Sequence, residues 1–186
     1  MTIAATALWR RLDLPGHDAC VLEMRPEGWI INGAAAYRQA TGPAWLTYKV
    51  ACDKAWRTLS GTIGGFLGPK PIAHSIARRG NAWLLNGETV AGLDHLVDLD
   101  LGFTPATNTI QLRRVPLAVG AAAEIPAAWL DVDNGTLSEL PQHYERRSET
   151  AFWYRAPSFG YEALLEFATN GLIRRYPDLW EAEADG

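Results

Sequence analysis

Asn-Gly dipeptides recur along this chain and constrain its fold more than any other feature. They occur at Asn32-Gly33, Asn86-Gly87, Asn134-Gly135 and Asn170-Gly171, between runs rich in β-branched and aromatic residues. Both central residues of a type I′ turn need positive φ, which Asn and Gly tolerate best. The dipeptides therefore predict β-hairpins, with strands that pair antiparallel.

Two-residue loops at three of these dipeptides also predict which residues face each other. The predicted partners are Glu166 with Arg175 and Phe167 with Arg174, Trp83 with Val90, and Val132 with Leu137. A helix over Tyr161–Ala168 is the rival interpretation there, because Phe159, Ala163 and Phe167 are four residues apart. The opposite charges of Glu166 and Arg175 favour the strand, because such pairs stabilise adjacent strands.

Further strands are predicted where apolar residues alternate or where β-branched and aromatic residues gather. The predicted strands are Ala19–Arg25, Trp45–Asp53, Trp56–Ile63, Ile72–Arg78 and Thr109–Val119. The Ala-rich stretch Gly120–Trp129 is expected to be a short helix or loop. Many short strands at close spacing predict an all-β, mainly antiparallel fold, either a barrel or a sandwich.

The length of 186 residues suits one domain, and no linker divides it. An internal sequence similarity suggests duplicated strand modules, at about 18–66 and 72–119. Arg25 to Gly33 resembles Arg79 to Gly87, and Asp53 then corresponds to Asp100. The alternative is that separate hairpins reuse the same turn chemistry.

The composition excludes several classes of function. A net charge of -4 argues against a nucleic-acid-binding protein. The two cysteines are too few for a disulfide scaffold, and the start of the chain lacks the pattern of a signal peptide. No apolar run approaches the roughly 20 residues that span a bilayer, so we expect a cytoplasmic protein without a transmembrane segment. Composition does not indicate an oligomeric state.

The segment from Asp98 to Arg114 has the densest polar pattern. Asp98 and Asp100 are two residues apart, so on a strand both point to one face. Three roles are open for them. They are an acid–base pair, an ionic lock with Arg113, or acceptors for ligand hydroxyls. Thr107 and Asn108 lie in the turn-rich run that follows, and they are further candidate ligand-binding residues.

A second candidate segment combines Asp53, Trp56 and Arg57, which are an acid, an indole and a guanidinium. Sugar sites need planar hydroxyl partners and a stacking ring, whereas the plainer interpretation is an edge tryptophan beside an external ion pair. The eight tryptophans, Trp83 among them, are either core anchors or walls around a lipid or sugar. No His or Cys has metal-ligand spacing, and no serine lies in a nucleophile elbow. The sequence predicts no catalytic residue, metal or cofactor.

The run from Asp98 to Thr109, followed by Arg113-Arg114, resembles the signature of the putative glycolipid-binding family of bacteria. Supporting matches are Gly16-His17-Asp18, Asp53 with Trp56-Arg57-Thr58, and Tyr176-Pro-Asp-Leu-Trp180. The resemblance spans nearly the whole chain. It implies a single-domain curled, many-stranded sheet, a half-open barrel or β-roll remotely like periplasmic lipoprotein carriers. It implies no catalytic residues.

Three functions are weighed. The leading hypothesis is a binding protein for an amphipathic small molecule, such as a glycolipid, held in the concave face of a curled sheet. Its ligand would meet Asp53, Trp56, Arg57, Trp83, Asp98, Asp100, Thr107, Asn108 and Arg113. The alternatives are an enzyme on a sugar- or lipid-linked substrate using Asp98 or Asp100, and a ligand-free β interaction module.

Overall fold

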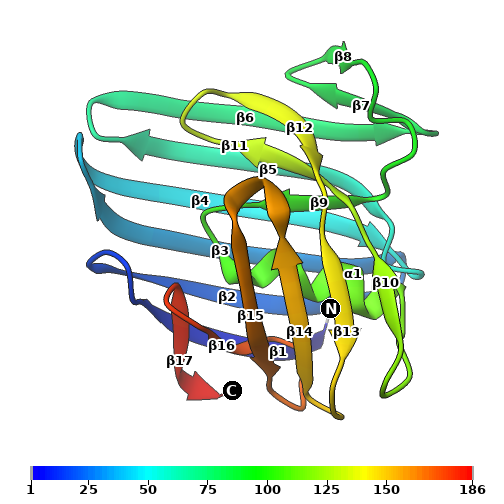
Figure 1. The fold of residues 1–186 in the computed structure, drawn as a ribbon. Helices are drawn as coiled ribbons and strands as arrows, with labels where there is room; N and C mark the ends of the chain where they lie inside the picture. Colours follow the sequence, from blue (N-terminus) through cyan, green and yellow to red (C-terminus); the bar gives the residue numbers. More distant parts are fainter. Residues whose placement is uncertain (1, 186) are drawn as a thin grey trace.

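A computed structural model describes residues 2–185, which form two β-sheets and little helix (Figure 1). The larger, antiparallel sheet contains, in hydrogen-bonding order, β10 (Ala122–Glu124), β13 (His143–Arg146), β14 (Ala151–Ala156), β15 (Tyr161–Phe167), β16 (Ile173–Tyr176), β17 (Trp180–Asp185), β1 (Thr2–Arg11), β2 (Gly16–Arg25), β3 (Gly28–Gln39), β4 (Gly42–Asp53), β5 (Thr58–Leu67), β6 (Lys70–Arg79), β7 (Ala82–Leu85) and β8 (Glu88–Val90). The smaller sheet contains β12 (Thr136–Leu140), β11 (Ala127–Asp131) and β9 (Asp98–Leu101), with β11 parallel to β9. The α-helix among the described residues is α1 (Asn108–Arg114), and 3-10 turns occur at Pro105–Thr107 and Pro157–Phe159.

The large sheet curls so that its two halves face each other. Strands β1 to β6 lie side by side across the back of the molecule, and β13, β14 and β15 cross in front at a steep angle (Figure 1). Helix α1 lies between the two halves, while β11 and β12 lie in front of β5 and β6. The edge strands β10 and β8 do not pair with each other, so the sheet is open. The predicted all-β fold is confirmed, and the barrel is not closed.

Alternating burial explains the long strands. In β4 the side chains of Ala44, Leu46, Tyr48, Val50 and Cys52 are all buried, whereas the residues between them are half-buried or exposed. Successive side chains of a strand point to opposite faces. One face of β4 therefore packs into the core, and the other points away from it.

Strand β9 packs directly on the inner face of the large sheet. Gly61 of β5 has no side chain, and a Cβ there would lie 2.6 Å from the Leu99 side chain. Leu99 and Leu101 are fully buried against this face. Because side chains alternate along β9, Asp98 and Asp100 point the other way.

Two hydrophobic cores meet at α1. The first lies between β1–β6 and the small sheet and includes Trp9, Leu46 and Ile110. The second lies under β13–β15 and includes Tyr144, and Leu112 of α1 packs against it. Helix α1 therefore lies between the two cores and contributes a side chain to each of them.

Of the four predicted cross-strand pairs, two are confirmed and two are wrong. The confirmed pairs are Trp83 with Val90 and Glu166 with Arg175. Phe167 was predicted to face Arg174 but faces Ile173, next to a bulge. Leu137 was predicted to face Val132 but faces Leu130. Asn134-Gly135 ends a four-residue loop rather than forming a two-residue one, because the Asp131 carboxylate accepts the N–H groups of Asp133 and Asn134.

The predicted hairpin at Asn32-Gly33 is wrong, because the dipeptide lies in the middle of β3. Gly33 faces Tyr48 on β4, and a Cβ on Gly33 would lie 2.4 Å from the Tyr48 hydroxyl. The missing side chain lets the Tyr48 ring cross β3 and reach Asp18 on β2. This glycine provides space rather than a turn.

The segment Thr109–Val119, predicted as a strand, begins instead with α1. The Thr104 hydroxyl accepts the Ala106 N–H, and Pro105 occupies the first position of the 3-10 turn Pro105–Thr107, which leads directly into α1. A capping threonine before a proline is a helix-start signal. The stretch Gly120–Trp129, expected to be a helix or loop, instead contributes to β10 and β11.

Candidate ligand-binding site

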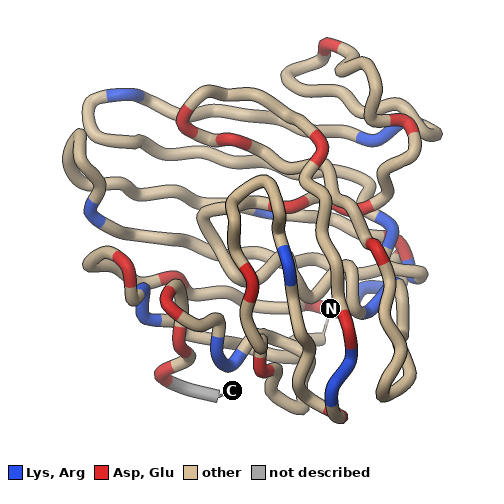
Figure 2. The backbone as a smooth tube through the Cα atoms, viewed as in Figure 1, with Lys and Arg blue, Asp and Glu red and all other residues tan. Residues whose placement is uncertain are grey.

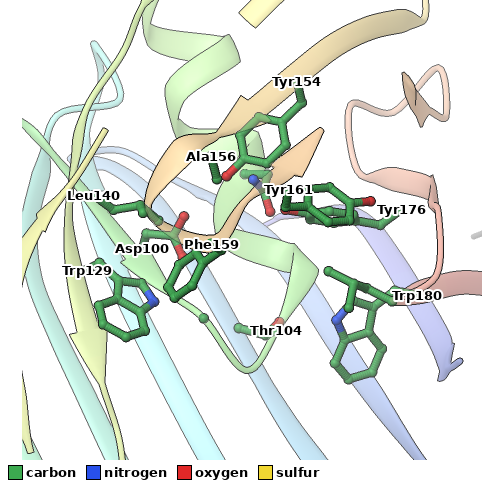
Figure 3. A pocket seen from close by; sticks show the side chains of 13 residues that line it. Asp100, Thr104, Trp129, Leu140, Tyr154, Ala156, Phe159, Tyr161, Tyr176 and Trp180 are labelled. Atoms are coloured by element: carbon green, nitrogen blue, oxygen red, sulfur yellow. The ribbon is translucent and has the colours of Figure 1, made fainter. Parts of the chain in front are cut away.

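A pocket of about 400 Å³ opens where the small sheet meets the crossing strands (Figure 3). Its lining residues are Asp100, Gly102, Thr104, Asn108, Trp129, Leu140, Tyr154, Ala156, Phe159, Tyr161, Tyr176, Leu179 and Trp180. They come from both sheets and α1, so only the curl of the sheet brings them together. The volume falls within the roughly 300–1,000 Å³ typical of small-molecule pockets.

Asp100 supplies the one carboxylate among the lining residues. It is 6% exposed, and Gln142 Nε2 donates to its Oδ2 at 2.6 Å. Among the described residues this is the only hydrogen bond to the Asp100 side chain. Burial raises the pKa of Asp100 to about 6, and the Gln142 bond opposes the rise only in part. At neutral pH the pocket therefore contains a mostly ionised carboxylate.

A chain of buried polar groups orients Gln142. Asn108, at the start of α1, donates through Nδ2 to the Tyr144 hydroxyl at 2.9 Å. That hydroxyl donates in turn to Oε1 of Gln142 at 3.4 Å. Tyr144 and Gln142 are fully buried. The network orients the Gln142 amide so that Nε2 faces Asp100.

Thr104 connects the pocket wall to a second buried carboxylate, Asp18 on β2. The hydroxyls of Thr104 and Tyr48 both donate to Asp18, Tyr48 at 3.0 and 3.1 Å. Burial raises the pKa of Asp18 to about 6, although these hydrogen bonds lower it. Among the described side chains, none forms an ion pair with Asp18. A fully buried carboxylate thus lies directly behind Thr104.

Aromatic rings form the rest of the wall. The rings of Trp129 and Phe159 meet edge to face at 5.2 Å, and those of Tyr161 and Tyr176 lie 5.4 Å apart. Phe159 is 56% exposed. The Trp129 indole lies against Gly102, where a Cβ would approach Nε1 to 2.4 Å. Gly102 therefore sets the position of that indole.

Asp98 has a structural role instead. Its two oxygens accept hydrogen bonds of 2.7 Å from Nε and Nη2 of Arg114, and its side chain is fully buried. The predicted ionic lock exists, but its arginine is Arg114 and not Arg113. The reason is that α1 replaces the expected strand, which changes the residue that faces β9. Burial still raises the pKa of Asp98, with Arg114 opposing it.

Four other predicted residues belong to turns or to the core. Asp53 accepts the Arg57 N–H at 2.9 Å and stabilises the turn after β4. Trp83 is fully buried, and its indole donates to the Leu96 carbonyl at 3.1 Å. The Thr107 hydroxyl, also buried, accepts a backbone N–H from β9 at 3.2 Å. None of these four side chains lines the aromatic pocket.

Trp56 and Arg113 meet outside the pocket. Trp56 stacks on Trp29 with ring centroids 4.6 Å apart, and the Arg113 guanidinium lies 6.0 Å from the Trp56 ring. Arg113 also donates to the Asn170 carbonyl at 2.7 Å. Of the predicted ligand-binding residues, the structure brings Asp100 and Asn108 together in the aromatic pocket.

Most of the pocket was missed by sequence reasoning. Trp129, Tyr154, Phe159 and Tyr161 stand in strands and turns without any local motif. Tyr176 and Trp180 did carry a signal, because they delimit the segment Tyr176-Pro-Asp-Leu-Trp180, which the family resemblance singled out. Gln142 follows a proline and carries no signal that identifies its contact with Asp100.

The described residues offer no evident metal or membrane-spanning element. Among the residues whose side chains the structure describes, no group of three or more His, Cys, Asp or Glu is arranged to hold a metal ion. Likewise, no helix in this part of the chain is both long and apolar enough to cross a bilayer.

Comparison with known proteins gives one family and one fold. The family described as "Putative glycolipid-binding" matches residues 6–182. A crystal structure of a DUF1089 family protein from Pseudomonas aeruginosa is similar with a TM-score of 0.77 and 22% identity, covering 88% of this chain and 91% of that one. No curated protein matches the chain.

Proposed function

The chain belongs to the family described as "Putative glycolipid-binding", and from that premise we propose that it binds a glycolipid with the sugar in the aromatic pocket. The observation that carries the proposal is the meeting of several aromatic rings with Asp100 and Asn108 in one cavity of about 400 Å³. Such pockets pair apolar walls with a few placed polar groups.

The two kinds of wall match the two faces of a sugar. The rings of Trp129 and Tyr176 offer flat apolar surface to the C–H face. Asp100 accepts from a hydroxyl, and the charge makes that bond strong. The Trp129 indole N–H, which makes no hydrogen bond to another described residue, can donate to a hydroxyl oxygen. A hydroxyl both donates and accepts, so it suits this pairing.

The exposed Phe159 at the pocket provides contact for the start of an acyl chain. Each methylene removed from water contributes about 0.8 kcal/mol. A few methylenes against Phe159 and Leu179 thus add affinity without requiring the pocket to hold the whole chain.

A binding role fits the site better than hydrolysis of a glycoside. Hydrolysis usually needs two carboxyl groups that flank the scissile bond. The pocket lining contains Asp100 alone, because Asp98 is held by Arg114 away from it. The pocket volume also argues against a ligand-free interaction module.

The test is calorimetric titration with octyl glucoside below its micelle concentration, together with native mass spectrometry of the purified protein for bound lipid. Phe159→Ala is expected to weaken binding about tenfold through lost apolar contact. The matched control is Trp45→Ala, because Trp45 is 46% exposed on β4 and lies outside the pocket. Absence of both a bound lipid and a titration signal would contradict the proposal, as would equal effects of the two variants.

A further inference from the structure

We infer that the pocket selects head groups without negative charge, so its ligands are neutral or amino sugars and not phosphorylated, sulfated or carboxylated ones. This inference rests on the proposed function, since it specifies the ligand class of the same pocket. It follows from the charge of the wall rather than from its shape.

The pocket wall carries negative charge and no positive charge. None of its lining residues in the described part of the chain is Lys, Arg or His. Burial raises the pKa of Tyr154, Tyr161 and Tyr176, so these hydroxyls remain neutral. Asp100 is therefore the group that sets the formal charge of the wall.

The Asp100 carboxylate is uncompensated, in contrast to its neighbour. Asp98, two residues earlier on β9, receives two hydrogen bonds from Arg114. Asp100 receives one, from the neutral Gln142 amide, and makes no ion pair with a described residue. Its Oδ1 accepts no hydrogen bond from the residues whose side chains the structure describes. A buried carboxylate in this state is satisfied by a ligand that donates hydrogen bonds or carries positive charge.

Two further features strengthen the negative potential. Asp18 lies behind Thr104 and is also buried without an ion pair among the described residues. The faces of the lining rings are the negative ends of their quadrupoles, which attract cations. An anionic head group would meet like charge in a desolvated cavity, an arrangement that suppresses binding strongly.

The test compares three amphiphiles with one tail, namely octyl glucoside, octyltrimethylammonium and octyl sulfate, each below its micelle concentration. Calorimetry at pH 8 is expected to show octyl sulfate binding at least about tenfold more weakly than octyl glucoside. Asp100→Asn should reduce this difference and weaken octyltrimethylammonium. Glu139→Gln, on an exposed carboxylate of β12 outside the pocket, should change neither.

A pH titration of the wild-type protein provides a second measurement that needs no variant. The charges of octyl sulfate and octyltrimethylammonium are constant between pH 5 and 8, whereas Asp100 titrates, with its pKa raised to about 6. The discrimination against octyl sulfate should therefore shrink as the pH falls to 5. Octyl sulfate that binds as tightly as octyl glucoside at pH 8, and loses its affinity in Phe159→Ala, would overturn this inference alone. If none of the three amphiphiles binds, the proposed function is overturned together with it.

Discussion

Asp100→Asn is expected to stabilise the protein at pH 8. The carboxylate is 6% exposed and has Gln142 as its single described hydrogen-bond partner, so its charge is poorly compensated. Asparagine has the same shape, and its carbonyl oxygen can still accept the Gln142 N–H. The variant therefore removes a buried charge without creating a cavity.

The magnitude follows from the pKa, which rises from 3.8 to about 6. The difference is about two units, and each unit corresponds to 1.36 kcal/mol, so the charge costs about 3 kcal/mol above pH 6. The folded state binds the proton more tightly than the unfolded state. The contribution of protonated Asp100 to the free energy of unfolding is therefore fully present below pH 3.8, and it is lost as the pH rises through about 6. For a chain of this length, 3 kcal/mol corresponds to a rise in Tm of about 6–12 °C.

The assay is thermal and urea unfolding of wild type and variant from pH 5 to 8. The difference between the two proteins isolates Asp100, because Asp18, which also titrates near pH 6, is common to both. The stabilisation should be largest at pH 8 and shrink toward pH 5. A variant that is less stable than wild type at pH 8, or a difference that does not change with pH, would refute the reasoning.

Three further outcomes are expected. Asp98→Asn should destabilise by about 3 kcal/mol in urea unfolding, opposite in sign to Asp100→Asn, because it breaks a buried bidentate ion pair; a stabilising effect would contradict the lock. Gly102→Ala should weaken octyl glucoside binding with a small loss of Tm, because its Cβ would collide with the Trp129 indole; unchanged affinity would show that this indole is not part of the site. Trp9→Phe should lower the free energy of unfolding by about 2–3 kcal/mol, because it removes a 2.6 Å hydrogen bond to the buried Ile173 carbonyl and leaves a void. Chemical denaturation measures this loss.

Sequence reasoning succeeded where structure is local. Alternation identified most long strands, and Asn86-Gly87 identified both a hairpin and its register. It failed where a glycine served tertiary packing, as at Gly33, whose missing side chain admits the Tyr48 ring. It also failed at Thr109–Val119, because β-branched residues suggested a strand, whereas the 3-10 turn that begins at Pro105 leads into α1.

The duplication of strand modules remains a prediction. Asp53 stabilises a turn of the large sheet, whereas its proposed counterpart Asp100 lies in a strand of the small sheet. Superposition of residues 18–66 on 72–119 is the measurement that decides it, and failure of the two segments to overlay would end the idea.

By itself, the sequence determined the fold class, the family and the acidic segment on β9, because strand alternation, turns and motifs are written in neighbouring residues. The tertiary structure decided what those acids do. Arg114 reaches Asp98 from α1, and Gln142 reaches Asp100 from the segment after β12. The pocket likewise assembles from Asp100 to Trp180, across strands that meet only when the sheet curls. Burial and partner geometry, which set the charge state of each acid, exist only in that folded arrangement.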